Sequence, residues 1–386
     1  MNTKSIIQNV SKALVTLFLF TNGVESTAFA QSFNSGSDGS YGQMNIISNT
    51  TLNLPTNGIF NCTTITVASG ATLKFNRNGL NTPVYLLATD DVTITGIIDV
   101  SASDYIGISG GKGGLGGFDG GDGGKGGSGL GGTGLGGDGQ GPGGGRNVDP
   151  EPYKPGVFAQ NSINNTRIYG NSLLIPFIGG SGAAGVNRNS GGGGGGWGGG
   201  AILVASNTKI IVTGQIRAIG GQGQVSGGSG GAIRLVSPTV SGSGTLLVPG
   251  GPVAGGSGRI RVDCLDGNAV KSLRTTGVAS RGAQMYVFPT VVPRLDIIEA
   301  AGQLIPFPPT SGVSVVLLVG TPTNQIIRVQ AKDFTNDVPI TVAVIPNDRP
   351  TSNYLATITM TNNPSVVSVP VTLAVDSTNR IMVWTR

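Results

Sequence analysis

Acidic and basic side chains gather in different copies of a recurring, strand-rich segment. Four aspartates fall within residues 84–104, namely Asp90, Asp91, Asp99 and Asp104. Four arginines fall in later copies, namely Arg217, Arg234, Arg259 and Arg261. Carboxylates can hold Ca²⁺ or accept hydrogen bonds from sugar hydroxyls, and a guanidinium group can bind the carboxylate of an acidic sugar. The sequence therefore predicts a glycan-binding group, made of Asp90, Asp91, Asp99, Arg217 and Arg234.

A plainer interpretation stays open beside this one. The same aspartates and arginines suit turns and the outward faces of strands, where charges are solvated and share no site. Convergence of Asp90, Asp91 or Asp99 with Arg217, Arg234 or Lys209 around a concave face would favour a shared site, and charges scattered over separate faces would remove the enzyme option.

Several kinds of catalysis are excluded by composition. The chain has no histidine, which rules out His-based triads, zinc sites and proton transfer. Lys112 and Lys125 lie among glycines but outside any phosphate-loop motif. Asp119, Asp122 and Asp138 lack the apolar position of the glycine-rich calcium repeat. No catalytic residue, metal or cofactor is predicted, and the balance leans against an enzyme.

Internal repeats give the first structural expectation. Residues 84–102 (VYLLATDDVTITGIIDVSA), 201–220 (AILVASNTKIIVTGQIRAIG) and 232–251 (AIRLVSPTVSGSGTLLVPGG) share short aliphatic runs around a glycine turn, and residues 259–265 begin the pattern again. Such runs predict strands, with almost no helix. A unit this small must stack on its neighbours to bury a core. We expect an all-β fold whose first part is a right-handed parallel β-helix.

Glycine tracts interrupt these repeats. Between positions 110 and 145, 23 of 36 residues are glycine, and a second tract covers residues 191–200 around Trp197. Collagen is excluded because proline is scarce there. Two alternatives remain: a flexible linker, or a packed bundle of extended three-per-turn glycine helices whose backbones hydrogen-bond side by side.

The composition changes again near Pro293. Glycine thins out and apolar residues alternate with polar ones, which is typical of an immunoglobulin-like β-sandwich. The expected domains are a signal peptide (1–30), N-terminal β-helix coils (31–105), a glycine-rich insertion (106–200), C-terminal β-helix coils (201–290) and an Ig-like sandwich (291–386).

The first thirty residues predict export. Lys4 and Lys12 precede the apolar run 13–20, and Ala28-Phe29-Ala30 is a small-x-small cleavage site. No later stretch is apolar enough to span a membrane. No basic cluster interleaved with aromatic residues is present, so nucleic acid is not expected as a partner. Cys62 and Cys264 could be separate buried thiols or one long-range bridge.

Several stretches resemble a group of secreted, glycine-rich, β-helix-like bacterial proteins without an assigned biochemical role. They are residues 33–39 (FNSGSDG), 81–100 (NTPVYLLATDDVTITGIIDV), 174–176 (LIP) before 179–182 (GGSG), 230–240 (GGAIRLVSPTV), 255–262 (GGSGRIRV) and 295–310 (LDIIEAAGQLIPFPPT). More distantly, the combination is similar to passenger regions of β-helical surface adhesins. The resemblance implies an exported β-helix-like protein and brings no catalytic residues with it.

These observations predict a non-catalytic structural or adhesive protein, secreted or on the cell surface. Polysaccharide, cell-surface components or further copies of the chain are the expected partners. The alternative is a carbohydrate-active β-helix protein that binds or cleaves an acidic polysaccharide.

Overall fold

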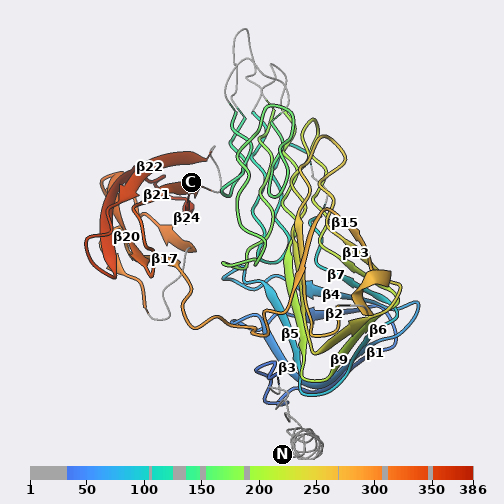
Figure 1. Cartoon of the computed structure of the whole chain (residues 1–386). Helices are drawn as coiled ribbons and strands as arrows, with labels where there is room; N and C mark the ends of the chain where they lie inside the picture. The colour runs from blue at the N-terminus through green and yellow to red at the C-terminus, as the bar shows by residue number, and fades with distance from the viewer. Residues whose placement is uncertain are drawn as a thin grey trace, which may run out of the picture. The chain divides into compact units, whose positions relative to one another are not determined.

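The computed structural model describes residues 33–103, 107–124, 136–147, 154–186, 192–267, 269–306, 312–346 and 351–385. The predicted signal peptide lies outside these residues. The described part is all-β, as expected, with two parallel sheets and two antiparallel four-stranded sheets (Figure 1). Its only helix is the short 3₁₀ helix η1 (Ala269–Ser272), and none of the described residues forms a helix long and apolar enough to cross a membrane.

Sixteen short strands make the two parallel sheets. The ten-stranded sheet has the order β12-β9-β6-β3-β5-β8-β11-β14-β16 with β1 beside β3, and the six-stranded sheet has the order β15-β13-β10-β7-β4-β2. The strands are β1 (Gly42–Ile46), β2 (Thr50–Asn53), β3 (Ile59–Val67), β4 (Thr72–Asn76), β5 (Val84–Ala88), β6 (Val92–Ile94), β7 (Ile97–Asp99), β8 (Ala201–Ser206), β9 (Lys209–Val212), β10 (Gln215–Arg217), β11 (Ala232–Val236), β12 (Thr239–Ser241), β13 (Thr245–Leu247), β14 (Arg259–Asp263), β15 (Arg274–Thr276) and β16 (Val278–Gly282).

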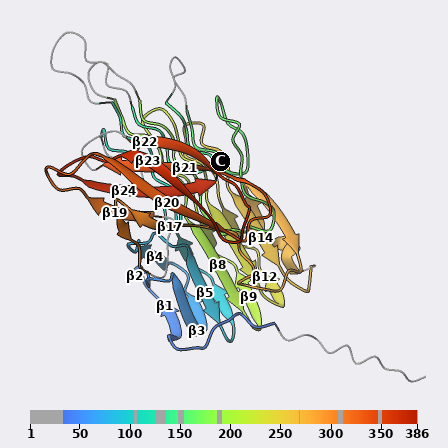
Figure 2. The same cartoon turned by 90° about the vertical axis from the view of Figure 1, so that its left-hand side faces the viewer.

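The sequence repeats stack strand on strand. Ala232, at the start of one repeat, pairs with Ala201 of the preceding repeat and with Arg259 of the following one. The third strands pair in the same way, with Ile216 beside Ile98 and Leu246. Figure 2 shows β3, β5, β8 and β14 running along one another. The predicted parallel pairing of the repeats is therefore confirmed.

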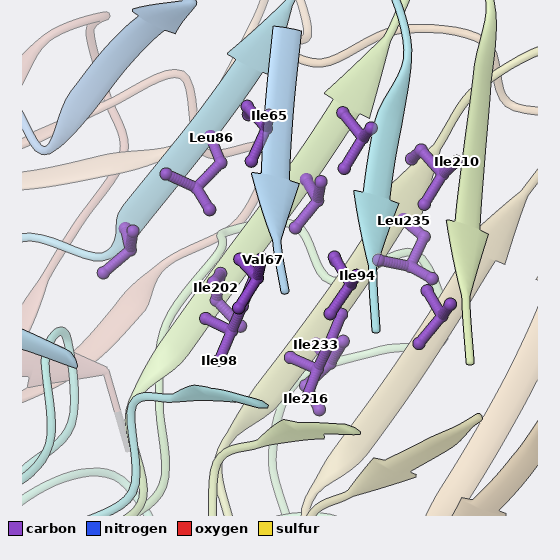
Figure 3. Close-up of a cluster of buried hydrophobic side chains, with 14 of the residues drawn as sticks. Ile65, Val67, Leu86, Ile94, Ile98, Ile202, Ile210, Ile216, Ile233 and Leu235 are labelled. Atoms are coloured by element: carbon purple, nitrogen blue, oxygen red, sulfur yellow. The ribbon is translucent and has the colours of Figure 1, made fainter. Parts of the chain in front are cut away.

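Aliphatic side chains from each repeat meet in one core. Ile98, Ile216 and Leu246 lie in register and are fully buried. Figure 3 shows Ile98 and Ile216 with side chains from the other sheet, such as Ile202 and Ile233. Because alternate residues of a strand point to opposite faces, even strands of three residues contribute to this core.

A glycine ladder forms the corner before each third strand. A Cβ on Gly214 would lie 1.9 Å from the carbonyl oxygen of Gly96, and one on Gly244 would lie 2.5 Å from that of Gly214. The glycine turn seen in every repeat thus allows successive corners to stack in backbone contact.

The described parts of the glycine tracts are packed, with hydrogen bonds in steps of three residues. In the segment 192–200, every third N–H donates to one neighbouring segment over 2.7 to 2.9 Å, through the pairs Gly192–Gly124, Gly195–Gly121 and Gly198–Phe118. The next residue of each triplet accepts from a second neighbour over 2.8 to 3.0 Å, through the pairs Gly193–Val186, Gly196–Ala183 and Gly199–Gly180. A three-residue period is that of an extended, left-handed helix without internal hydrogen bonds. Figure 1 draws these segments as traces without arrows.

A side chain would collide with a neighbouring backbone at most glycines of this bundle of segments, which we call the glycine bundle (the described residues of 107–124, 136–147, 179–186 and 192–200). A Cβ on Gly198 would lie 1.8 Å from the carbonyl oxygen of Gly180, and one on Gly192 equally close to that of Val186. Of the two alternatives, packing is the one found, because these residues bond to one another over long sequence distances. The remainder of the tracts lies outside the described residues.

The C-terminal part forms the two antiparallel sheets, β18-β17-β20-β23 and β19-β24-β21-β22. Their strands are β17 (Arg294–Ala300), β18 (Gln303–Leu304), β19 (Gly312–Val316), β20 (Asn324–Lys332), β21 (Val338–Pro346), β22 (Ser352–Ile358), β23 (Ser365–Thr372) and β24 (Thr378–Thr385). The predicted alternation is confirmed: Ile327, Val329 and Ala331 of β20 are fully buried in a core shared by both sheets.

Candidate functional site

Arg234 lies in a buried ion cluster on the outer side of β11. Its Nη2 is 3.1 Å from Oδ2 of Asp263, and Arg261 Nη2 is 2.6 Å from the other oxygen of that carboxylate. Arg234 and Asp263 are 2% and 0% exposed. Two guanidinium groups therefore share one carboxylate that has no contact with water.

The segment that follows β16 closes over this cluster. Arg234 donates to the carbonyl oxygens of Gln284 and Tyr286 and lies 5.0 Å from the Tyr286 ring centroid. The N–H of Gln284 donates to Asp263. Removing one member of such a buried cluster is costly, because a charge is left unpaired. Arg234 thus connects β11 to Asp263 and to residues 284–286, and it is not accessible to a ligand.

Asp90 and Asp91 lie in the turn between β5 and β6. Asp91 accepts a hydrogen bond of 2.6 Å from the Thr208 hydroxyl and pairs with Lys209 Nζ at 3.0 Å. The Thr208 hydrogen bond, helped by Lys209, lowers the pKa of Asp91 below its ordinary value. Asp90 makes a 3.3 Å contact with the Thr89 hydroxyl. Both Asp91 and Lys209 are about half exposed, so water screens their attraction.

Asp99 and Arg217 are direct neighbours. They are register partners on β7 and β10, and both project from the outer face of the six-stranded sheet. The Arg217 guanidinium lies along its own strand and donates twice to Gln215 Oε1, at 2.6 and 2.9 Å. Asp99 accepts from the N–H of Ser101 at 3.0 Å. These two residues are the pair among the five predicted ones that the fold brings together on an open surface.

Two further cations share that face and were missed by the sequence analysis. Lys74 of β4 lies 3.9 Å from Asp99, and its side chain is 60% exposed. Arg274 of β15 is exposed, and its row contains Thr245 and Gln215 as successive register partners. Counting the register from the repeat alignment would have found Arg274, since it holds the same place in its repeat as Gln215.

We call this surface the cationic face and define it by Lys74, Asp99, Gln215, Arg217, Thr245 and Arg274. Its three cations outnumber its one carboxylate. Adjacent strands of a parallel sheet are about 4.8 Å apart, so Asp99 and Arg217 are spaced by roughly that distance along a flat surface. The geometry suits contacts to an extended ligand laid across the strands.

Asp119, considered as a calcium ligand in the glycine tract, has other partners. Its carboxylate bonds Arg77 at 2.8 Å and Arg380, and accepts from the N–H of Gly113 at 2.7 Å. Burial acts to raise the pKa of Asp119, but the charges of Arg77 and Arg380 outweigh burial and lower it. Among the described residues no group of three or more His, Cys, Asp and Glu side chains is placed to hold a metal ion.

The five predicted residues therefore fall in three places: Asp90 and Asp91 at a turn, Arg234 in a covered cluster, and Asp99 with Arg217 on the cationic face. Asp104 lies outside the described residues. No protein-family model, curated protein or solved structure matches this chain. Its function must be argued from this geometry.

Proposed function

We propose that this chain is a non-catalytic structural and adhesive protein, exported and held outside the cell or at its surface. In this proposal the two parallel sheets are the walls of a right-handed β-helix with glycine-rich insertions, and the antiparallel sheets are an Ig-like sandwich. The resemblance to secreted glycine-rich proteins and the leader-like first thirty residues support the same location.

The observation that carries the proposal is the unbroken register on either side of the long insertion. β7 ends at Asp99 and β8 begins at Ala201, yet β5 pairs with β8 and β7 with β10 residue for residue. The intervening glycine segments satisfy their backbone groups on one another. A scaffold that carries a large, well-bonded insertion without losing its stacking suits a stiff spacer that presents a surface.

A second candidate function follows from the cationic face. Asp99 lies beside Arg217 and within 3.9 Å of Lys74, so a carboxylate and two bases are together on one surface. An acidic polysaccharide could be cleaved there by β-elimination, with Arg217 or Lys74 in its neutral form as the base. The base would take the proton from the carbon next to the carboxyl group, a C=C bond would form, and the glycosidic C–O bond at the following carbon would break, with water protonating the leaving sugar oxygen. The long Lys74–Asp99 contact argues for binding over cleavage, because Lys74 is 60% exposed and is neither held in place nor desolvated.

One experiment separates the two functions. The mature protein, beginning at Gln31, is incubated with a panel of bacterial and plant polysaccharides with and without Ca²⁺, and both retention and release of unsaturated sugars are measured. We expect retention without release. Any unsaturated product would establish the lyase function and overturn the non-catalytic proposal. Finding the uncleaved chain inside the cell would overturn the proposed export.

A further inference from the structure

The three outer faces of the parallel sheets differ in what covers them. On β8 and β11 every residue is buried, so both faces of these strands are covered. Phe33 and Val287, from opposite ends of this part of the chain, pack on Leu87, Leu203 and neighbouring residues there. That face is closed to a large ligand.

The outer face of β6, β9 and β12 is open but electrically balanced. Its register rows place Thr93 beside Ile211, and Ile211 beside Ser241. The charges at its edge are Asp91 and Lys209, which pair with each other. No net charge distinguishes this surface.

The cationic face is both open and charged. On β7, β10 and β13 the central residue is buried while its two neighbours are partly exposed. Lys74, Arg217 and Arg274 are opposed by Asp99 alone. The positions between them hold Gln215 and Thr245 together with the partly exposed apolar side chains of Ile97 and Leu247. The excess of positive charge favours a negatively charged ligand.

We propose that the cationic face binds a linear anionic polysaccharide, laid across the strands of the six-stranded sheet. This inference rests on the proposed adhesive function and names its ligand. Lys74 and Arg217 lie two strands apart, on either side of Asp99 of β7, so they bind carboxylates of alternate sugars, while Gln215 and Thr245 exchange hydrogen bonds with sugar hydroxyls. Flat rows spaced by one strand suit a polymer whose repeat is about one sugar long.

Nucleic acid is the less favoured polyanion. Proteins that hold single strands stack bases on aromatic rings within a basic groove. The outer positions of β4, β7, β10, β13 and β15 carry no aromatic residue. An excess of two positive charges is also small for a contact dominated by phosphates.

The test uses the mature full chain and polygalacturonate as the probe, with neutral dextran and a twenty-residue thymidine oligonucleotide as comparisons. The triple variant Lys74→Gln, Arg217→Gln, Arg274→Gln removes the three cations of the face. A matched control, Lys112→Gln, Lys209→Gln, Lys332→Gln, removes three exposed cations elsewhere. Thermal unfolding checks that both variants fold like the parent chain.

We expect the face variant to bind polygalacturonate at least about tenfold more weakly at low salt and the control to change less than about twofold. A gain-of-charge variant, Thr245→Lys, should tighten binding about threefold. Equal losses in both triple variants, or failure of the parent chain to bind, would overturn the inference. Tighter binding of the oligonucleotide would overturn the choice of ligand. Each of these results leaves the proposed function standing, since released unsaturated sugars would contradict its non-catalytic part and an uncleaved intracellular chain would contradict its export.

Discussion

The parallel sheets are held together by packed side chains, whereas the glycine bundle is held together by contacts between backbones. Between the sheets, Ile98, Ile216 and Leu246 fill space with side chains, and burial of apolar surface stabilises the stack. In the bundle, Gly198 and Gly180 bring backbones into contact, and hydrogen bonds take the place of a core. Removing side-chain volume should therefore destabilise the sheets, and adding side-chain volume should destabilise the bundle.

The largest effect is expected from adding one methyl group to the bundle. Gly198→Ala places a Cβ 1.8 Å from a backbone oxygen that no rotamer change can move away. We expect a loss of about 4 kcal/mol in the free energy of unfolding, at the upper end for a single substitution. Urea unfolding followed by tryptophan fluorescence measures it, with Trp384→Phe in both chains so that the buried Trp197 is the only reporter.

The matched control is Gly79→Ala. Nothing lies within 4 Å of a Cβ at Gly79, and its backbone lies outside the left-handed region. Its stability should stay within about 0.5 kcal/mol of the parent chain. Similar losses for Gly79→Ala and Gly198→Ala would contradict the close packing of the bundle.

The converse change belongs in the sheets. Ile216→Ala empties a fully buried position and should cost about 3 kcal/mol, whereas Ile216→Val should cost about 1 kcal/mol. Chemical denaturation of both variants gives the comparison. An unchanged free energy of unfolding in both variants would mean that the sheets, like the bundle, are held together mainly by backbone hydrogen bonds.

Asp119 joins the two regions, because it lies in the bundle and bonds Arg77 of the segment after β4. Asp119→Asn should cost about 2 kcal/mol at neutral pH, less than a fully buried pair because the arginines are partly exposed. The pKa of Asp119 is below the ordinary 3.8 in the folded chain. Its contribution is therefore complete above pH 3.8 and is lost as pH falls through the folded-state pKa.

Melting temperatures of the parent chain and Asp119→Asn across the acidic range measure this dependence. The difference between the two should be constant from neutral pH to about pH 5 and shrink at more acidic pH. A difference that persists unchanged in strong acid would show that packing, and not charge, explains the loss.

The smallest effect concerns the thiols, which are free and buried in the sheets. Burial raises the pKa of Cys62 to about 12, so almost no thiolate exists at pH 8. Iodoacetamide should leave Cys62 unlabelled in the native chain and label it in urea, as judged by mass spectrometry. Rapid native labelling would mean that the β3 end of the stack opens readily.

The spacing of aliphatic runs predicted much of the parallel part. Ala201, Ala232 and Arg259 begin their repeats and lie side by side, so aligning the repeats amounted to reading the register. The same alignment places Asp99 beside Arg217. The aspartates and arginines were grouped by repeat in the sequence analysis, and the alignment was not used to pair them. Local periodicity was sufficient to predict strand pairing wherever a strand pairs with the equivalent strand of the neighbouring repeat.

Other features depend on segments that no local pattern connects. Arg234 looks like an outward-facing strand residue, and only the return of residues 284–286 over Asp263 buries it. In the glycine bundle, the triplet phase suggested packing but could not identify partners. Gly198 bonds Phe118 and Gly114 through its backbone alone, and one glycine is indistinguishable from another in a sequence.

The three-residue step of the bundle also restricts how its length can change. Each residue of a triplet faces a different neighbour, so inserting one residue turns the rest of that segment by about 120° and moves its donors away from their acceptors. Adding or removing a whole triplet leaves every later donor facing the same neighbour. Segments such as 192–200 should therefore tolerate growth and shrinkage in threes, much as a coding sequence tolerates indels that keep its reading frame.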